Sequence, residues 1–230
     1  MSIKKLALDV LYLITNEKNI ESIVKEMLNY ILEAEPEFLQ DLTLKVIWLF
    51  QVITIKICSS VEKYSPDRRW HIDTIIKVLT LAGNYVKDES IYSLLHLIAA
   101  TPQLQNYAVH KIFFSLRENI TQDGLCKVGL WCIGEFGQLI ISGKAVAPDN
   151  TPIQISEEEV INLIERILKR FGLSELVKEY TLTCLIKLYT KFNRTKDKIR
   201  ELIDSQTTSP SLEVQQRACE YLQLLDGDWD

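Results

Sequence analysis

Apolar residues recur at helical spacing along most of this sequence, and this recurrence restricts the chain to helical folds. The first stripe follows the i, i+3, i+4, i+7 pattern through Ile20, Ile23, Val24, Met27, Leu28, Ile31 and Leu32. Later stripes comprise Ile72, Ile75, Ile76 and Leu79; Ile91, Leu94, Leu95 and Ile98; Val160, Ile164, Ile167, Leu168 and Phe171; Val177, Thr181, Cys184, Leu185, Leu188 and Phe192; and Leu212, Cys219, Leu222 and Leu225. No segment alternates convincingly as a strand would. We therefore expect an all-α fold.

Residues that favour helix ends bracket these stripes. The predicted starts are Asn19 as an N-cap, Thr101 with Pro102 as N-cap and first helical residue, Ser156 with Glu159 as a capping box, Ser174, and Ser209 with Pro210. Gly83 follows one stripe and suits the position just after a helix. The longest gap, at residues 143–155, holds two prolines and is expected to be a loop.

The helices group naturally into pairs. Residues 19–225 accommodate about five pairs at ~41 residues per pair, which is the period of HEAT and armadillo repeats. Leu182, Ile186 and Tyr189 form a second apolar stripe beside the first on their helix, as a helix packed between two neighbours requires. The sequence therefore predicts an α-solenoid over residues 1–225, followed by a flexible end at residues 226–230.

Composition excludes several protein classes. Apolar residues make up 47% and charged residues 25%, so the chain can bury enough apolar surface to fold. The formal charge of −5 gives no overall basic footprint for nucleic acid. The start, MSIKKLALDV, does not read as a secretory leader. The uncharged run at residues 46–55 is about half the ~20 residues of a spanning helix, so we expect it to be packed.

No catalytic or metal-binding motif stands out. The five cysteines, Cys58, Cys126, Cys132, Cys184 and Cys219, include no CxxC pair, and reduced thiols on helix faces are expected. His71, His96 and His110 lie too far apart in sequence for a helical metal pair. Residues 137–144 fail as a phosphate-binding loop, because five residues separate the glycines and Ala145 follows the lysine. Gly129, Gly134 and Gly137 suit close helix packing and a helix end instead. We predict no catalytic, cofactor-binding or metal-binding residue.

One local cluster is basic. It consists of Lys187, Lys191, Arg194, Lys196, Lys198 and Arg200, with Asp197 as the acid among them. The cluster could bind an acidic partner or anionic lipid, or it could be a solvated helix end where cations are favoured. The second interpretation is the more common for a charge run.

Five blocks of sequence carry a family resemblance. They are residues 19–38 (NIESIVKEMLNYILEAEPEF), 64–88 (YSPDRRWHIDTIIKVLTLAGNYVKD), 131–143 (WCIGEFGQLIISG), 152–160 (PIQISEEEV) and 212–222 (LEVQQRACEYL). In this order they resemble the γ-adaptins, the large subunits of the clathrin adaptor complex of the trans-Golgi network and endosomes. The α and ε adaptins are the nearest alternatives, and WHIDT and WCIGEFG favour γ.

The resemblance implies the C-terminal half of an adaptin trunk, a noncatalytic α-solenoid scaffold. It implies packing against β, μ and σ adaptins, recruitment with an Arf-family GTPase, peripheral membrane association as a complex, no nucleic acid, and cargo sorting into coated vesicles. Clathrin would be bound indirectly, through family segments that this chain lacks. Residues 222–226, LQLLD, approach a clathrin-binding pattern, but Gln223 breaks it and helical packing is the better interpretation. An importin-like carrier is the alternative scaffold, and an enzyme domain finds no candidate site.

The chain departs from the family at one place. Residues 47–57, IWLFQVITIKI, intervene where the family pattern runs directly from Val46 to Cys58. Eleven helical residues turn only about 20° beyond three full turns, so a helical insert would keep both flanks on their original faces. We expect a continued helix, with an apolar end projecting beyond its neighbours; an unspliced segment is the alternative. We also expect self-association through the first helix face, Leu6, Val10, Leu13 and Ile14.

Overall fold

The computed structural model describes residues 10, 11, 13–16, 18–33, 43–142, 145, 146 and 152–227. Within these, the side chains of residues 27, 28, 30–33, 43–50, 145, 146, 152 and 153 are not described. The chain forms two compact units, Met1–Leu104 and Gln105–Asp230. The all-α prediction is confirmed, with one short β-ladder as the exception among the described residues.

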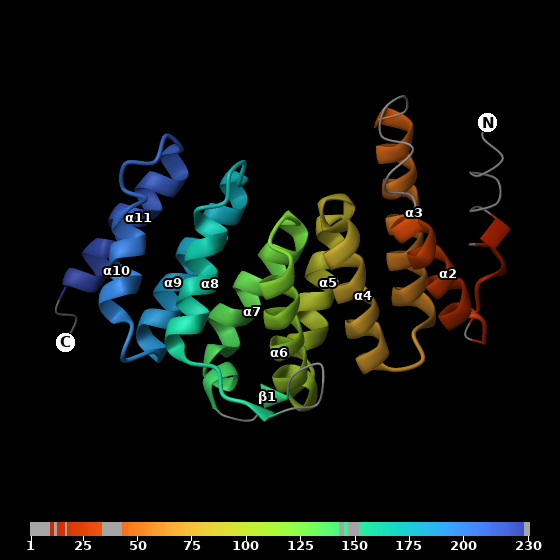
Figure 1. Cartoon of the computed structure of the whole chain (residues 1–230), viewed down its shortest axis with the longest axis horizontal. Helices are drawn as coiled ribbons and strands as arrows, with labels where there is room; N and C mark the ends of the chain where they lie inside the picture. The colour runs from red at the N-terminus through yellow and green to blue at the C-terminus, as the bar shows by residue number, and fades with distance from the viewer. Residues whose placement is uncertain are drawn as a thin grey trace. The chain divides into compact units, whose positions relative to one another are not determined.

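The first unit is a layered set of helices (Figure 1). Its elements are α2 (Ile20–Glu33), α3 (Thr43–Tyr64), α4 (Arg68–Ala82), the 3₁₀ turn η1 (Gly83–Tyr85), α5 (Asp88–Ala99) and the start of α6 (Pro102–Glu118). Helix α4 packs against α3 and α5, and α2 packs against α3 and α4. The predicted stripes form the core here: Ile72, Ile75, Ile76, Leu79, Ile91, Leu94 and Ile98 are at most 1% exposed.

Two predicted helix boundaries in the first unit differ in detail. Asn19 precedes α2, but its side-chain oxygen accepts from the backbone N–H of Asn16 and its amide donates to the Ile14 carbonyl, on the side away from the helix. Gly83 has a φ of −59° and continues into the 3₁₀ turn, so α4 does not end on a left-handed glycine. Asp67, which was not among the predicted caps, caps α4 by accepting from the Trp70 N–H at 2.7 Å.

Helix α3 runs without interruption through residues 47–57, as predicted for a helical insert. Ile53 and Ile57 are at most 1% exposed, so the second half of the insert lies in the core. Thr54 is also buried, and its hydroxyl has no hydrogen-bond partner. The predicted apolar projecting end rests on residues whose side chains lie outside the described set.

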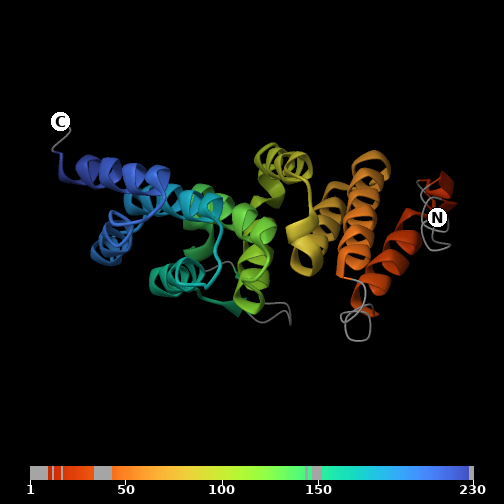
Figure 2. The ribbon, with the colours of Figure 1, turned by 90° about the horizontal axis from the view of Figure 1, so that it is seen from above.

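The second unit contains the remaining elements. They are the rest of α6, α7 (Asp123–Ile141), β1 (Ala145–Val146), β2 (Pro152–Ile153), α8 (Glu157–Leu168), α9 (Glu175–Lys191), α10 (Lys196–Asp204) and α11 (Leu212–Asp226). Helix α9 packs against α7 on one side and α11 on the other (Figure 1 and Figure 2). The capping box is confirmed: the Ser156 hydroxyl accepts from the Glu159 N–H, and the Glu159 carboxylate accepts from the Ser156 N–H.

The number of residues along the chain between helices that pack against each other is uneven in this unit. Lys187 of α9 pairs with Glu135 of α7, 52 residues earlier in the chain. Thr183 of α9 meets Arg217 and Tyr221 of α11, which are 34 and 38 residues later. The wider interval contains the segment between α7 and α8, where β1 and β2 pair antiparallel with Ala145 opposite Ile153. The predicted average of ~41 residues therefore combines a long and a short interval.

Helix α7 packs mainly against α9 in the second unit. Two of its glycines lie where a side chain would meet a neighbour: a Cβ on Gly129 would be 2.2 Å from Leu116 Cδ1, and one on Gly137 would be 2.6 Å from Leu188 Cδ2. The predicted close packing is thus confirmed, but neither glycine ends the helix. Of the described helices, α7 alone is long and apolar enough to cross a membrane, and 61% of its apolar stretch is buried within the fold.

The predicted stripes are wrong at two helix ends. Helix α8 ends at Leu168, so Phe171 lies beyond it with its side chain fully exposed. Helix α11 begins at Leu212, with Ser211 rather than Ser209 as its N-cap. It buries Val214 and Ala218 and leaves Leu212 75% exposed. Phe171 leaves the stripe because α8 ends before it, whereas Leu212 lies within α11 about 200° around the helix from buried Val214.

Candidate partner-binding surface

A shallow hollow lies over α7, α9 and α11. Its volume is about 270 Å³, and it is lined by Leu130, Trp131, Glu179, Tyr180, Thr183, Cys184, Lys187 and Arg217. These residues come together because α9 packs against α7 on one side and against α11 on the other. Aromatic rings with polar rims are typical of surfaces that receive a partner's side chain.

The charged groups around the hollow are neutralised within the unit. Lys187 forms an ion pair with Glu135 across α7 and α9. The Arg217 guanidinium donates to Glu213 at 2.5 Å and to the Thr183 hydroxyl at 3.3 Å. It also lies 3.6 Å from Glu179. The charges that line the hollow are therefore paired with one another or with neighbouring side chains of the same unit.

One residue that lines the hollow, Trp131, contacts a bend in α7. Phe136 has φ −117° and ψ 19°, which are not helical values, although the helix continues on both sides. The Trp131 and Phe136 rings meet edge to face with centroids 5.9 Å apart. The Lys191 ammonium group donates to the carbonyls of Gly134 at 2.5 Å and Glu135 at 2.7 Å, immediately before the bend.

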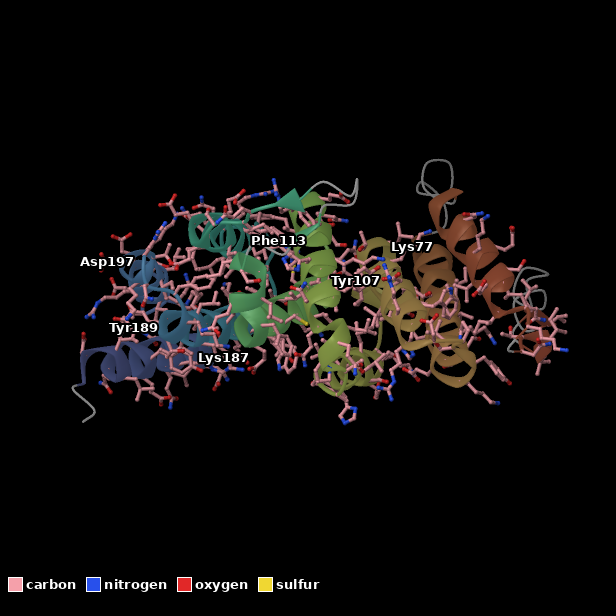
Figure 3. All side chains as sticks on the ribbon, turned by 90° about the horizontal axis from the view of Figure 1, so that it is seen from below. Lys77, Tyr107, Phe113, Lys187, Tyr189 and Asp197 are labelled. Carbon is pink, nitrogen blue, oxygen red and sulfur yellow. The ribbon has the colours of Figure 1, made fainter. Side chains whose placement is uncertain are left out.

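The predicted basic cluster is dispersed by the fold. Lys187 and Lys191 point to α7, as described. Lys198 donates to Asn162 at 2.5 Å and pairs with Glu165 at 2.8 Å, and Arg200 pairs with Asp226. Lys196 lies over the Tyr189 ring at 5.2 Å, and Figure 3 shows Tyr189 and Asp197 at the same end of the second unit. The cluster is therefore mainly a set of contacts between helices, an outcome that neither sequence interpretation anticipated.

Arg194 differs from the rest of the cluster. Its side chain is exposed and lines a second hollow with Glu157 and Glu158. Its backbone N–H donates to the Glu157 carboxylate at 2.8 Å, which also accepts from the Asn193 N–H at 3.3 Å. Glu157 thus supplies an anion to the turn before α10, where a helix N-terminus favours negative charge.

The thiols and imidazoles do not assemble a reactive site. Cys58, Cys126, Cys132 and Cys184 are buried, and burial raises the pKa of each thiol, to about 12 for Cys58, Cys126 and Cys184. Such thiols are poor nucleophiles, because the thiolate is the reactive form. Buried His110 bonds through Nδ1 to the Asn106 carbonyl at 2.6 Å. Among the described residues, no three metal-ligating side chains gather.

Similarity to known proteins extends over nearly the whole chain. The sequence profile of the family described as "Adaptin N terminal region" matches residues 1–228. The chain belongs to this adaptin family.

Three similar relatives are gamma subunits of AP-1 complexes. The AP-1 complex subunit gamma of Dictyostelium discoideum is 39% identical over 232 residues, 99% of this chain and 25% of its own length. The AP-1 complex subunit gamma-1 of Mycosarcoma maydis is 34% identical over 98% of this chain and 25% of its own length. That of Arabidopsis thaliana is 33% identical over 98% and 24%. The adaptin chain thus spans about a quarter of the length of these relatives, and the resemblance to γ-adaptins is confirmed.

No pattern in the sequence of this adaptin predicted the hollow. Trp131, Tyr180 and Arg217 stand on three helices separated by loops of different length, so no sequence spacing relates them. The second apolar stripe predicted for α9, through Leu182 and Ile186, was the one available signal that α9 has neighbours on two sides. It did not indicate where those neighbours leave a gap.

Proposed function

We propose that this chain is a noncatalytic scaffold in a clathrin-associated adaptor complex for vesicle-mediated intracellular protein transport and cargo sorting. The observation that carries the proposal is the adaptin match over residues 1–228, on a chain whose described part is built of packed helices. Stacked helical repeats offer long surfaces for other proteins. The relatives' names place them in the AP-1 complex, and this chain is proposed to act there too.

The proposed partners are β, μ and σ adaptins, with recruitment by an Arf-family GTPase. The proposed location is the cytoplasmic face of the trans-Golgi network, endosomes and coated vesicles. The hollow at Trp131 and Tyr180 supports a subunit contact, because aromatic anchors in a partly buried setting are the usual centres of protein interfaces. Clathrin is reached through other parts of the complex rather than through residues 222–226. Those residues lie within α11, and Asp226 is paired with Arg200.

The test is co-purification from cells that express the tagged chain together with β, μ and σ adaptins. We expect mass spectrometry to recover at least one of these subunits with the tagged chain. The variant Tyr180→Ala should reduce the recovery, while Tyr92→Ala, which removes a 57% exposed ring from the first unit, should not. Circular dichroism of both variants checks that helicity is retained.

Two results would redirect the proposal. Recovery of nuclear transport cargo without any adaptin would favour the alternative, an importin-like helical-repeat carrier. Recovery of subunits specific to an α-type or ε-type complex would reassign the chain to a related adaptor complex.

A further inference from the structure

The bend in α7 lies between two glycines of its own helix and beside a lysine that comes from α9. Helices bend sharply at proline, at glycine or serine pairs, or where a side chain inserts into the backbone hydrogen-bond ladder. No proline lies in α7, and Gly134 and Gly137 flank Phe136, so the helix is easily bent at this point. The Lys191 side chain reaches this bend from the last turn of α9 and donates to the Gly134 and Glu135 carbonyls.

The Lys191 contacts are suited to hold such a bend. One ammonium group satisfies two successive carbonyls, those of Gly134 and Glu135. Hydrogen bonds from a charged donor are about twice as strong as neutral ones, so this pair offsets much of the cost of disturbing the helix. Lys187, one turn earlier on α9, pairs with the Glu135 side chain. Glu135 of α7 is therefore bound at its backbone carbonyl by Lys191 and at its side chain by Lys187.

The backbones of α7 and α9 approach closely beside the bend. A Cβ on Gly134 would lie 3.3 Å from the Cα of Cys184, and Gly137 faces Leu188 and Phe192. This close approach lets a lysine on α9 reach main-chain carbonyls on α7. The bend is thus a property of the packed pair of helices.

We propose that Lys187 and Lys191 form a latch that imposes the bend at Phe136 from α9 and thereby sets the shape of the neighbouring hollow. Phe136 carries the edge-to-face contact with Trp131, and Trp131 and Lys187 both line the hollow. Release of the latch lets α7 relax toward a regular helix, which moves Trp131 relative to α9. The two lysines are positioning residues, and the hollow is conditional on their charge. This inference is independent of the adaptor function proposed above.

The experiment measures amide hydrogen exchange in the full chain and compares three variants. Lys191→Met keeps the aliphatic stem and removes the ammonium group, Lys191→Arg keeps a charged donor, and Lys178→Met makes the same change near the start of α9. We expect Lys191→Met to exchange at least about tenfold faster than the wild type in peptides covering residues 134–142. Lys191→Arg should stay within a few-fold of the wild type, and Lys178→Met should show no change there.

A second readout follows the bend itself. Nuclear Overhauser contacts between the Trp131 and Phe136 rings should be present in the wild type and lost in Lys191→Met. Unchanged exchange and unchanged ring contacts in that variant would overturn the proposal. Uniformly faster exchange over the whole second unit would also overturn it, because it would show a general stabilising role rather than a local latch.

A chemical probe covers the case in which Lys191→Met does not fold. Acetic anhydride modifies exposed amines, and Lys169 has a side chain that is 70% exposed. In the native wild type we expect Lys191 to be acetylated at least about tenfold more slowly than Lys169. Equal rates would mean that the ammonium group is not held on the two carbonyls, and the latch would be rejected.

Discussion

The Arg170 guanidinium forms an ion pair with the Asp123 carboxylate, 47 residues earlier in the chain. It also donates to the Ile120 carbonyl. The Arg170 side chain is 14% exposed and the Asp123 side chain 28%, so the pair is largely shielded from water. The contact ties the segment just after α8 to the first turn of α7, next in sequence to the exposed Phe171.

Loss of this pair should destabilise the second unit. We expect Arg170→Met to lower the free energy of unfolding by about 2 kcal/mol, because it leaves a partly buried carboxylate and a carbonyl without their donor. Lys169→Met, one residue earlier, should change it by less than about 0.5 kcal/mol, since the Lys169 side chain is 70% exposed and Glu165 keeps its pair with Lys198. Urea unfolding followed by circular dichroism checks both values. Equal losses in the two variants would contradict the assignment.

Two glycine substitutions should destabilise the chain for different reasons. Gly129→Ala should lower the free energy of unfolding by about 1 to 2 kcal/mol, because the new Cβ would overlap Leu116 and outweigh the helix propensity of alanine. Gly172→Ala should cost about 1 kcal/mol although no neighbour lies within 4 Å, because its φ is +71°. Gly172→Asn should cost less than Gly172→Ala, as asparagine tolerates this conformation; the reverse order would rule out the backbone explanation.

Glu165 should contribute to a dependence of stability on pH. Hydrogen bonds from Lys169 and then Lys198 lower the pKa of Glu165 from 4.5 to about 2. A lowered carboxyl pKa stabilises the folded state above the unfolded value, and this stabilisation disappears as the pH falls from 4.5 through 2. The difference in unfolding free energy between wild type and Glu165→Gln should therefore be larger at about pH 6 than at about pH 2. The effect should be modest and should shrink in high salt, because the lysines are near the surface. A difference that is constant with pH would refute it.

Deletion of residues 47–57 should preserve the fold and improve solubility. The insert nearly repeats the preceding stretch: Gln40, Thr43 and Lys45 correspond to Gln51, Thr54 and Lys56 at a spacing of 11. Leu42 and Val46 correspond to buried Ile53 and Ile57. After deletion, the earlier copy would join Cys58 on nearly the same helical face. Circular dichroism and thermal melting test this, and a large fall in helicity or melting temperature would show that the insert is required.

The first helical turn should promote self-association. Val10, Leu13 and Ile14 are 55%, 79% and 52% exposed, and Leu6 of the predicted face lies outside the described residues. We expect Leu13→Lys to lower the association measured by light scattering at high concentration. Leu224→Lys replaces another exposed leucine and should have a smaller effect. A wild-type chain that stays monomeric at high concentration would contradict the prediction.

Local signals in the sequence were sufficient for the helices and most of the core. The Ser156–Glu159 capping box lies within four residues, and the stripe from Ile72 to Leu79 repeats at a regular period, so both could be predicted. Helix ends were harder to predict. Asn19 bonds to Asn16 and Ile14 on the side away from its helix, and Gly83 continues into a 3₁₀ turn. Phe171 was assigned to a buried stripe because periodicity does not reveal where a helix stops. Leu212 was assigned to one because a few apolar residues do not decide which face of α11 is buried.

The hollow and the latch depend on contacts between residues that are far apart in sequence. Lys191 was grouped with its basic neighbours because charge runs are visible in sequence, whereas the carbonyls that it binds are 56 and 57 residues away. Every residue has a backbone carbonyl, so the residue types in a sequence do not show which carbonyl a lysine binds. A sequence of one protein therefore does not distinguish a lysine that meets a partner from one that meets its own main chain.

Because four of the five cysteines are buried, the labelling of thiols can show when helices of this chain separate. Cys219 is exposed, and the other four cysteines are buried with raised pKa values, as described for Cys58, Cys126, Cys132 and Cys184. A maleimide added to the native chain should therefore attach one label per molecule, on α11. Each additional label would require a helix pair to separate first, so the mass of the alkylated protein over time would record which pairs separate and in what order.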